Sequence, residues 1–441
     1  MRRIIIILAM IPFLMIAQEQ SKFTLKSSLE TGLANSKNIK IRQAAVRESE
    51  AKISEIGSQM YPKLSFTAGY VRFSDVPPFQ LSLPIFPNPV TIQETVLNNY
   101  QLKLSITQPL FTGFNLSSVK SASEFNSSAL DAELQKEMND EKFRIMNSFW
   151  NFAKAQNNLE LIEKRKEVFN SILNDAENFY ANGMFTKNDL LKVQVQASNI
   201  ELLKIEVANG VETARVFFNK VIGINLSTAT KINPNIVAEI SFNYSYNELL
   251  EKAFANRKEL EAQESRINSS KEFVTASQSG YYPQIFLFGN VYYNSPNQRY
   301  LPVQDEFNES WDVGVSLNWS LWDWGGTKSK VEQNEQKLVQ LQTMKSLLME
   351  GIEAEVYAAY LNAKKNFDKI EIMELNLKQS EENFRITQQQ FKNQIATGTD
   401  LIDAETAKYE SEINLINAKI DFRIAEAALL KSAGINLSEE L

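Results

Sequence analysis

Four segments of the chain alternate apolar and polar residues with a period of two. In one of them Leu102, Leu104 and Ile106 alternate with polar neighbours, and in another Val313 and Val315 do so. This alternation predicts strands with one apolar and one mostly polar face. The predicted strands cover residues about 62–73, 100–111, 283–294 and 311–322.

Most of the remaining chain carries apolar residues three and four positions apart. Leu338, Leu341, Met344 and Leu348 show this spacing, which predicts helices with one packed face. Because the same stretches are rich in Gln, Lys, Glu and Asn, we expect the helices to pack side by side like coiled coils. The longest would measure about 100 Å. The predicted helices cover roughly residues 24–59, 115–180, 186–223, 245–280, 327–393 and 397–434.

The two halves of the chain are copies of one another. Ala34-Asn35-Ser36-Lys37 recurs as Ala255-Asn256-Arg257-Lys258 with an offset of 221 residues, as does Tyr61-Pro62. The run Gly223 to Ser227 recurs letter for letter from Gly434 to Ser438 with an offset of 211. A single insertion of ten residues between about 71 and 100 explains why the offset falls from 221 to 211, so we predict a tandem duplication. The first repeat covers 18–227, a connecting (equatorial) segment 228–243, and the second repeat 244–441.

The N-terminus has the composition of a secretory signal peptide. Arg2 and Arg3 precede an unbroken apolar run over 4–16, and the small residue Ala17 ends it. We therefore predict a signal peptide at 1–17 and a mature chain outside the cytoplasm. No later stretch approaches 18 consecutive apolar residues, so the sequence predicts no transmembrane helix after cleavage.

Composition removes several classes of function. The chain has no cysteine and no histidine, which excludes disulfides, Cys/His zinc sites and histidine-based catalysis. No motif supports an enzyme, and the sequence predicts no cofactor and no metal site. The net charge of −7 argues against nucleic acid as a partner, because binding nucleic acid needs concentrated basic surface.

Two interpretations compete for the strands. They can form a soluble sheet over a core, or a transmembrane barrel whose apolar face meets lipid. Aromatic residues near the strand ends and the lack of a spare apolar helix face favour the barrel. Since about eight strands are the minimum for closure, four strands would require an assembly. A dimer would supply eight and a trimer twelve, and the amphipathic helices favour the larger ring. The loop inside the first strand pair is rich in proline (Pro77, Pro78, Pro84, Pro87, Pro89).

On these residues the chain resembles the TolC-like outer-membrane efflux proteins, also called outer membrane factors. The resemblance rests on the duplicated plan, on Gln108-Pro109-Leu110-Phe111 with Gly113 after the strands, and on the turn pattern G-x-x-[ST]-x-x-D. It implies a membrane protein that is mainly α with a β-barrel. A homotrimer would form twelve transmembrane strands in outer-membrane lipid and a coiled-coil-like periplasmic tunnel.

The resemblance also implies a function and partners. The chain would be one subunit of the channel-tunnel of a tripartite efflux or type I secretion system in a double-membraned bacterium. The duct would passively connect periplasm and exterior, and would dock onto a periplasmic adaptor (membrane fusion) protein and an inner-membrane pump. The alternative is a secreted coiled-coil scaffold or adhesin without a pore. The exported substrate belongs to the pump, so the sequence does not name it.

Two turns, at about 180–189 and 391–400, carry the candidate site. Thr186 with Asp189, and Thr397 with Asp400, have the spacing of capping boxes, and helix caps alone would account for them. The resemblance implies more, because it makes these turns the periplasmic tips of the tunnel. The residues it assigns to the tips and the adaptor contact are Gly183, Thr186, Asp189, Gln394 and Thr397.

The second turn carries an additional aspartate. Asp400 and Asp403 lie on one face of the same helix, and a cap needs only one of them. The resemblance implies that both aspartates ring the tunnel entrance, where a trimer would form a cation filter. Like charges at such a ring would raise some of the pKa values. Phe391 and Ala396 stand where related proteins often hold the entrance closed with a tyrosine and an arginine. The closed entrance is therefore expected either to rest on other contacts or to be less tightly latched.

Overall fold

The computed structural model describes residues 22–437 except 83, 86, 88, 94 and 235–239. The predicted signal peptide and part of the connecting segment therefore lie outside the described residues. The chain divides into two compact units. The helical unit contains the residues up to Lys40, Gln135–Arg257 and Glu350 onward, and the strand-bearing unit contains Ile41–Leu134 and Lys258–Met349. Each unit thus combines segments of both repeats.

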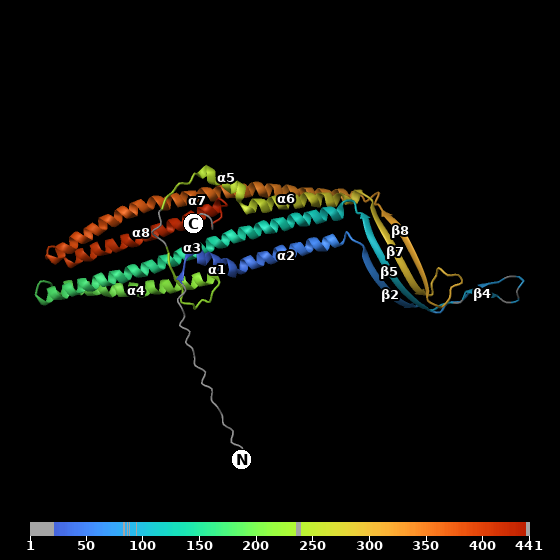
Figure 1. Cartoon of the computed structure of the whole chain (residues 1–441), viewed down its shortest axis with the longest axis horizontal. Coiled ribbons are helices and arrows are strands. Elements are labelled where there is room, and N and C mark those ends of the chain that lie inside the picture. Colours follow the sequence, from blue (N-terminus) through green and yellow to red (C-terminus); the bar gives the residue numbers. More distant parts are fainter. Residues whose placement is uncertain are drawn as a thin grey trace, which may run out of the picture. The chain divides into compact units, whose positions relative to one another are not determined.

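The predicted combination of long helices and four long strands is confirmed (Figure 1). Within the described residues, no helix has the length and apolar character needed to cross a membrane. In chain order the elements are β1 (Lys22–Phe23), α1 (Leu25–Asn35), α2 (Lys37–Ser58), β2 (Lys63–Arg72), β3 (Phe79–Leu81), β4 (Val90–Gln93), β5 (Asn98–Phe111), α3 (Asn115–Ala181), α4 (Lys187–Ile222), β6 (Lys231–Ile232), α5 (Tyr246–Asn256), α6 (Lys258–Ser277), η1 (Gln278–Tyr281), β7 (Gln284–Ser295), β8 (Asn308–Asn318), α7 (Gly326–Lys392) and α8 (Gly398–Ser432).

The first helix of each repeat is broken, where the sequence predicted one continuous helix. Ser36 separates α1 from α2 with ψ 121°, and Arg257 separates α5 from α6 with the same ψ. At the first break, the Asn35 side-chain amide donates to the Ile222 carbonyl at 3.1 Å. Gly223 follows α4 in the left-handed conformation, and a Cβ there would lie 2.6 Å from the Asn35 Cβ.

The second repeat has the same arrangement. Gly434 is left-handed, and a Cβ there would lie 3.0 Å from the Arg257 nitrogen. The two motifs that recur in each repeat therefore meet in space, where a helix break receives the end of another helix. Only glycine fits both the positive φ and the close approach. This contact explains physically why both motifs recur.

The strand-bearing unit holds an antiparallel sheet in the order β2-β5-β7-β8. In one cross-strand row Phe66 pairs with Leu104, Leu104 with Val291, and Val291 with Trp311. All four side chains are exposed, Trp311 to 71%. The sheet therefore leaves an apolar face uncovered in the described chain.

The opposite face of the sheet is mostly polar, with Phe286 and Phe288 as apolar residues in β7. Ser65, Ser105, Asn290 and Asp312 form a row there, and the Asn290 amide donates to the Asp312 carboxylate at 2.6 Å. The strand ranges overlap the four predicted ones. β2 and β8 are the edges of this sheet, with no strand partner on their outer sides among the described residues.

Small and polar side chains join the helices of the strand-bearing unit. Ala129 and Ala132 on α3 pack with Ala262 on α6. The carboxylate of Glu133 pairs with Arg42 on α2 at 3.0 Å and also with Arg266 on α6. Small residues allow close approach of the helices, and the charged pairs lie toward solvent.

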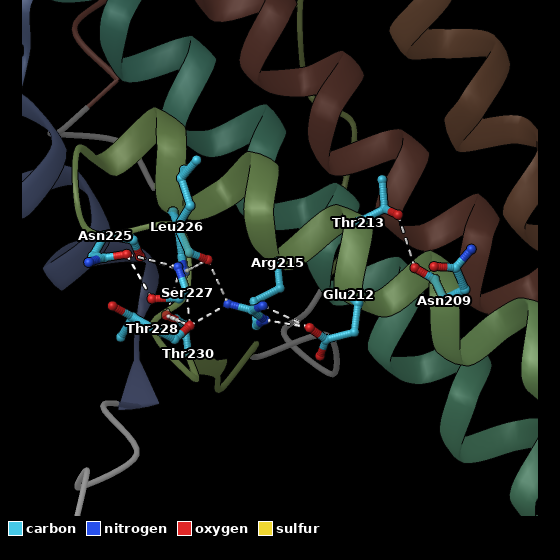
Figure 2. A network of polar contacts seen from close by, with 10 residues as sticks. Asn209, Glu212, Thr213, Arg215, Asn225, Leu226, Ser227, Thr228 and Thr230 are labelled. Atoms are coloured by element: carbon cyan, nitrogen blue, oxygen red, sulfur yellow. Dashed lines mark hydrogen bonds and ion pairs between the residues drawn. The ribbon is translucent and has the colours of Figure 1, made fainter.

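Aromatic residues fill the core of the helical unit. Phe149, Phe152 and Phe218 are each at most 1% exposed and pack with Ile145 and Ile222. The connection after α4 is fixed by polar contacts that Figure 2 shows around Arg215. The Arg215 guanidinium donates to the Leu226 carbonyl at 3.0 Å and to the Thr228 carbonyl, and pairs with Glu212.

Two short pairings escaped prediction. β1 pairs in parallel with β6, and the proline-rich loop contains an antiparallel hairpin of β3 and β4. Both involve only two to four residues per strand, too few to give a readable period.

Candidate functional site

The turn between α3 and α4 is held by its own main chain and one capping box. Gly183 is left-handed (φ 74°), and the Met184 N–H donates to the Phe179 carbonyl at 2.8 Å. The Thr186 hydroxyl accepts from the Asp189 N–H at 3.2 Å. The Asp189 carboxylate accepts from the Thr186 N–H at 3.2 Å and from its hydroxyl at 2.6 Å.

The turn between α7 and α8 repeats this geometry. Gln394 is left-handed (φ 62°) although it is not glycine, and the Ile395 N–H donates to the Gln390 carbonyl at 2.8 Å. The Asp400 carboxylate accepts from the Thr397 N–H at 2.9 Å and from its hydroxyl at 2.6 Å. The two repeats therefore contain matching turns. In the second turn the left-handed position is occupied by Gln394, whose backbone is strained in this conformation, whereas the backbone of glycine would not be.

The two aspartates of the second turn have different surroundings. Hydrogen bonds from the Thr397 hydroxyl and N–H hold the pKa of the Asp400 carboxyl below its usual range. Asp403 is exposed one turn further along α8. The Lys192 ammonium, at the position in α4 that matches Asp403, lies 3.5 Å from the Thr399 hydroxyl. Asp400 therefore serves as a cap, and the side chain of Asp403 reaches water.

The two turns share one apolar core. The rings of Phe179, Phe185 and Phe391 lie 5.4–5.6 Å apart pairwise. Phe391 is 2% exposed, and Ala396 packs against the same cluster. The structure thus places Phe391 and Ala396, which the resemblance assigned to the entrance, in the packing between the α3–α4 turn and the α7–α8 turn.

A buried ion pair near the turns was not anticipated. The Arg165 guanidinium on α3 lies 2.9 Å from the Glu405 carboxylate on α8, and both side chains are 6% exposed. The guanidinium also donates to the Thr406 hydroxyl at 2.9 Å and lies 4.3 Å from the Tyr409 ring centroid. Burial raises the pKa of Glu405 although Arg165 opposes the shift.

This ion pair has no counterpart in the aligned positions of the other repeat. With the offset of 211, Arg165 aligns with Asn376 and Glu405 aligns with Gln194, and both of these residues are neutral. A second ion pair, Lys154 with Asp421 at 3.0 Å, lies along the same helix pair. Charged residues on long helices usually face solvent, so burial of this pair could not be read from the period.

The described residues contain no group of three or more histidine, cysteine, aspartate or glutamate side chains placed to hold a metal ion.

Comparison with known proteins identifies relatives that cover most of the chain. A sequence model of the outer membrane efflux protein family matches residues 29–223 and 249–435. Outer membrane protein TolC of Vibrio cholerae is 21% identical over 298 residues, 67% of this chain and 68% of that protein. The alkaline protease secretion protein AprF of Pseudomonas aeruginosa is 21% identical over 355 residues, 77% of this chain and 70% of AprF.

Solved structures show the same fold. The outer membrane protein VceC from Vibrio cholerae superposes with a TM-score of 0.75 at 17% identity, covering 93% of this chain and 96% of VceC. The two ranges that the family model matches, 29–223 and 249–435, fall in the first and the second repeat, respectively.

Proposed function

We propose that three copies of this chain form one passive export duct. The chain belongs to the outer membrane efflux protein family, so it is an outer-membrane channel protein and not an enzyme. Three copies of the four-stranded sheet would close a twelve-stranded barrel. The long helices would wall a periplasmic tunnel. An adaptor protein and an inner-membrane pump would deliver the substrate, as in tripartite efflux or type I secretion.

The observation that carries this proposal is the geometry of the two free sheet edges. Each neighbouring pair in the order β2-β5-β7-β8 is antiparallel, so β2 and β8 also run in opposite directions. The β8 edge of one copy can therefore continue into the β2 edge of the next as one antiparallel ladder. In lipid, unpaired edges cost several kcal/mol per group, so closure is required.

The faces of the sheet fit the same proposal. The exposed apolar row that contains Phe66 and Trp311 would face outer-membrane lipid, and the polar row that contains Asn290 and Asp312 would face a wet lumen. At one end of the sheet Trp319, Trp322 and Trp324 are exposed, as aromatic girdles are at membrane interfaces.

The domain boundaries follow from this architecture. Residues 1–17 would direct secretion, and the repeats 18–227 and 244–441 would each supply one strand pair and one tip, joined by 228–243. The tips would contact the adaptor through residues that the two turns expose or position: Gly183, Thr186, Asp189, Gln394 and Thr397.

Asp400 and Asp403 would line the tunnel entrance. Three copies would bring their carboxylates around one axis and favour cations. Since Asp400 is engaged in its cap, Asp403 would make the larger contribution. Phe391 and Ala396 would hold the entrance through apolar packing with Phe179 and Phe185, in place of a polar latch.

Conductance in planar bilayers tests the filter. Asp403→Asn should lower the ratio of cation to anion permeability and weaken block by multivalent cations. Lys192→Gln, at the matching position of the other turn, is the control and should leave the cation preference in place. Unchanged selectivity in Asp403→Asn would remove the aspartate filter from the proposal, while absence of any pore from the unaltered protein would remove the duct itself.

A further inference from the structure

The β3–β4 hairpin has one apolar and one polar face. Gln80 pairs with Thr91, and their side chains are 3.3 Å apart in a hydrogen bond. Leu81 pairs with Val90, which puts these two on the opposite face because successive side chains alternate. Phe79 precedes Gln80 in β3 and therefore joins the apolar face, whereas Ile92 is the extra residue at the register shift between the Phe79–Gln93 and Gln80–Thr91 pairs.

This apolar face is uncovered in the described chain. Phe79 is 64% exposed, and Leu81 and Val90 are both 41% exposed. The sequence carries no charged residue between Asp75 and Glu94. An isolated two-stranded hairpin is only marginally stable in water. Packing of an apolar partner on this face would therefore stabilise the hairpin.

Chain connectivity fixes where the hairpin leaves the sheet. β3 follows β2 and β4 precedes β5, and Figure 1 shows the hairpin at the end of these two strands. The Phe73 N–H still donates to the Leu97 carbonyl at 2.8 Å, which continues the pairing past β2. At this end of the sheet the rings of Tyr70 and Tyr100 lie 5.0 Å apart. Aromatic residues mark the membrane interface, so the hairpin lies beyond the hydrocarbon.

The loop between β7 and β8 leaves the sheet at the same end. It is tied to β8, because the Tyr300 hydroxyl donates to the Glu309 carbonyl at 3.0 Å and Arg299 donates to the Trp311 carbonyl at 2.9 Å. Leu301, next to these anchored residues, is 84% exposed. The loop therefore presents an exposed apolar side chain directly after two residues that are anchored on β8.

We propose that the apolar face of the β3–β4 hairpin is an assembly surface, covered by the Leu301 loop of a neighbouring copy. The inference rests on the proposed ring, in which β8 of one copy pairs with β2 of the next. That pairing brings the Leu301 loop of one copy beside the hairpin of the next, because both leave the sheet at the same end. Within one chain the loop also contacts β5, since the ring centroids of Phe307 and Tyr100 lie 5.7 Å apart. The apolar residues of the hairpin nevertheless stay exposed.

Thiol cross-linking tests this contact, since the sequence has no cysteine. The variant Val90→Cys/Leu301→Cys, in outer membranes treated with a short bis-maleimide, should yield covalent dimers and trimers after heat denaturation. Thr91→Cys/Leu301→Cys is the matched control, because Thr91 follows Val90 in β4 and lies on the opposite face. We expect at least about fivefold less product in the control, since alternate residues of a strand point to opposite faces.

The outcomes separate the contact from the ring. Equal yields in the two double variants, or equal yield from Val90→Cys alone, would overturn the contact with Leu301. An uncross-linked Val90→Cys/Leu301→Cys protein that still runs as a trimer before heating would overturn it as well. If the unaltered protein forms no trimer, the proposed ring fails and the contact fails with it.

Discussion

Replacing Arg165 by methionine should destabilise the helical unit by about 3–5 kcal/mol, because it leaves a buried carboxylate without its cation. The ion pair joins α3 to α8, and both side chains are 6% exposed. The substitution also removes the hydrogen bond to Thr406 and the contact with the Tyr409 ring at 4.3 Å. That ring contact contributes up to about 2 kcal/mol where water is excluded.

The loss should depend on pH. Without Arg165, burial and the charge of Glu412 still raise the pKa of Glu405, and only Lys408 still lowers it. The pKa therefore rises further, because the main group that opposed the shift is gone. A carboxyl whose pKa is raised in the folded state stabilises fully below its unfolded pKa, and this contribution is lost as the pH rises through the folded pKa. Arg165→Met should therefore be more destabilised at pH 8 than at pH 5.

Urea unfolding followed by circular dichroism at the helical band measures this effect in detergent. Arg165→Met/Glu405→Leu should recover most of the lost stability, because it removes the unpaired charge along with its partner. Arg385→Met is the surface control, since Arg385 and Glu382 pair at 2.7 Å with both side chains 55% exposed, and it should change nothing measurable. A single variant within about 1 kcal/mol of the unaltered protein, or a double variant no better than the single, would refute the reasoning.

Further predictions concern the repeated motifs and the caps. Gly223→Ala should lower the free energy of unfolding by about 1–3 kcal/mol, because the position has a positive φ and the new Cβ would collide with Asn35. Gly210→Ala, whose Cβ would have nothing within 4 Å, should raise it by about 1 kcal/mol. Equal urea midpoints for the two variants would contradict the docking role of Gly223. Thr397→Ala should cost about 1 kcal/mol near neutral pH as a lost cap. Hydrogen bonds from Thr397 hold the pKa of Asp400 below its usual range in the folded state, so the carboxylate's part of the cap is lost as the pH falls through that pKa, while the Thr397 hydroxyl still accepts from the Asp400 N–H. The difference in melting temperature between the variant and the unaltered protein should therefore narrow in acid.

The elements that sequence predicted best are those with a long, regular period. α3 and α7 each run for 67 residues, and the stripe of Leu338, Leu341 and Met344 extends through enough turns to be unambiguous. The breaks at Ser36 and Arg257 were missed because no proline or glycine marks them. They are imposed by contact with Gly223 and Gly434, which lie far away in sequence.

The candidate site was predicted only as far as local chemistry reaches. The capping boxes of Thr186 and Thr397 follow from three-residue spacings, and the structure forms both. The joining of the two turns by Phe391 depends on packing between distant helices, which spacing does not encode. The Arg165–Glu405 pair is likewise a tertiary feature, since its matching positions Asn376 and Gln194 carry no charge.

Electron cryo-microscopy of the full chain purified from outer membranes tests the central claim most directly. The account predicts a threefold ring in which β8 of each copy pairs antiparallel with β2 of the next, so that three four-stranded sheets close one barrel. A monomer, or a ring whose copies meet only through helices with β2 and β8 left unpaired, would contradict it.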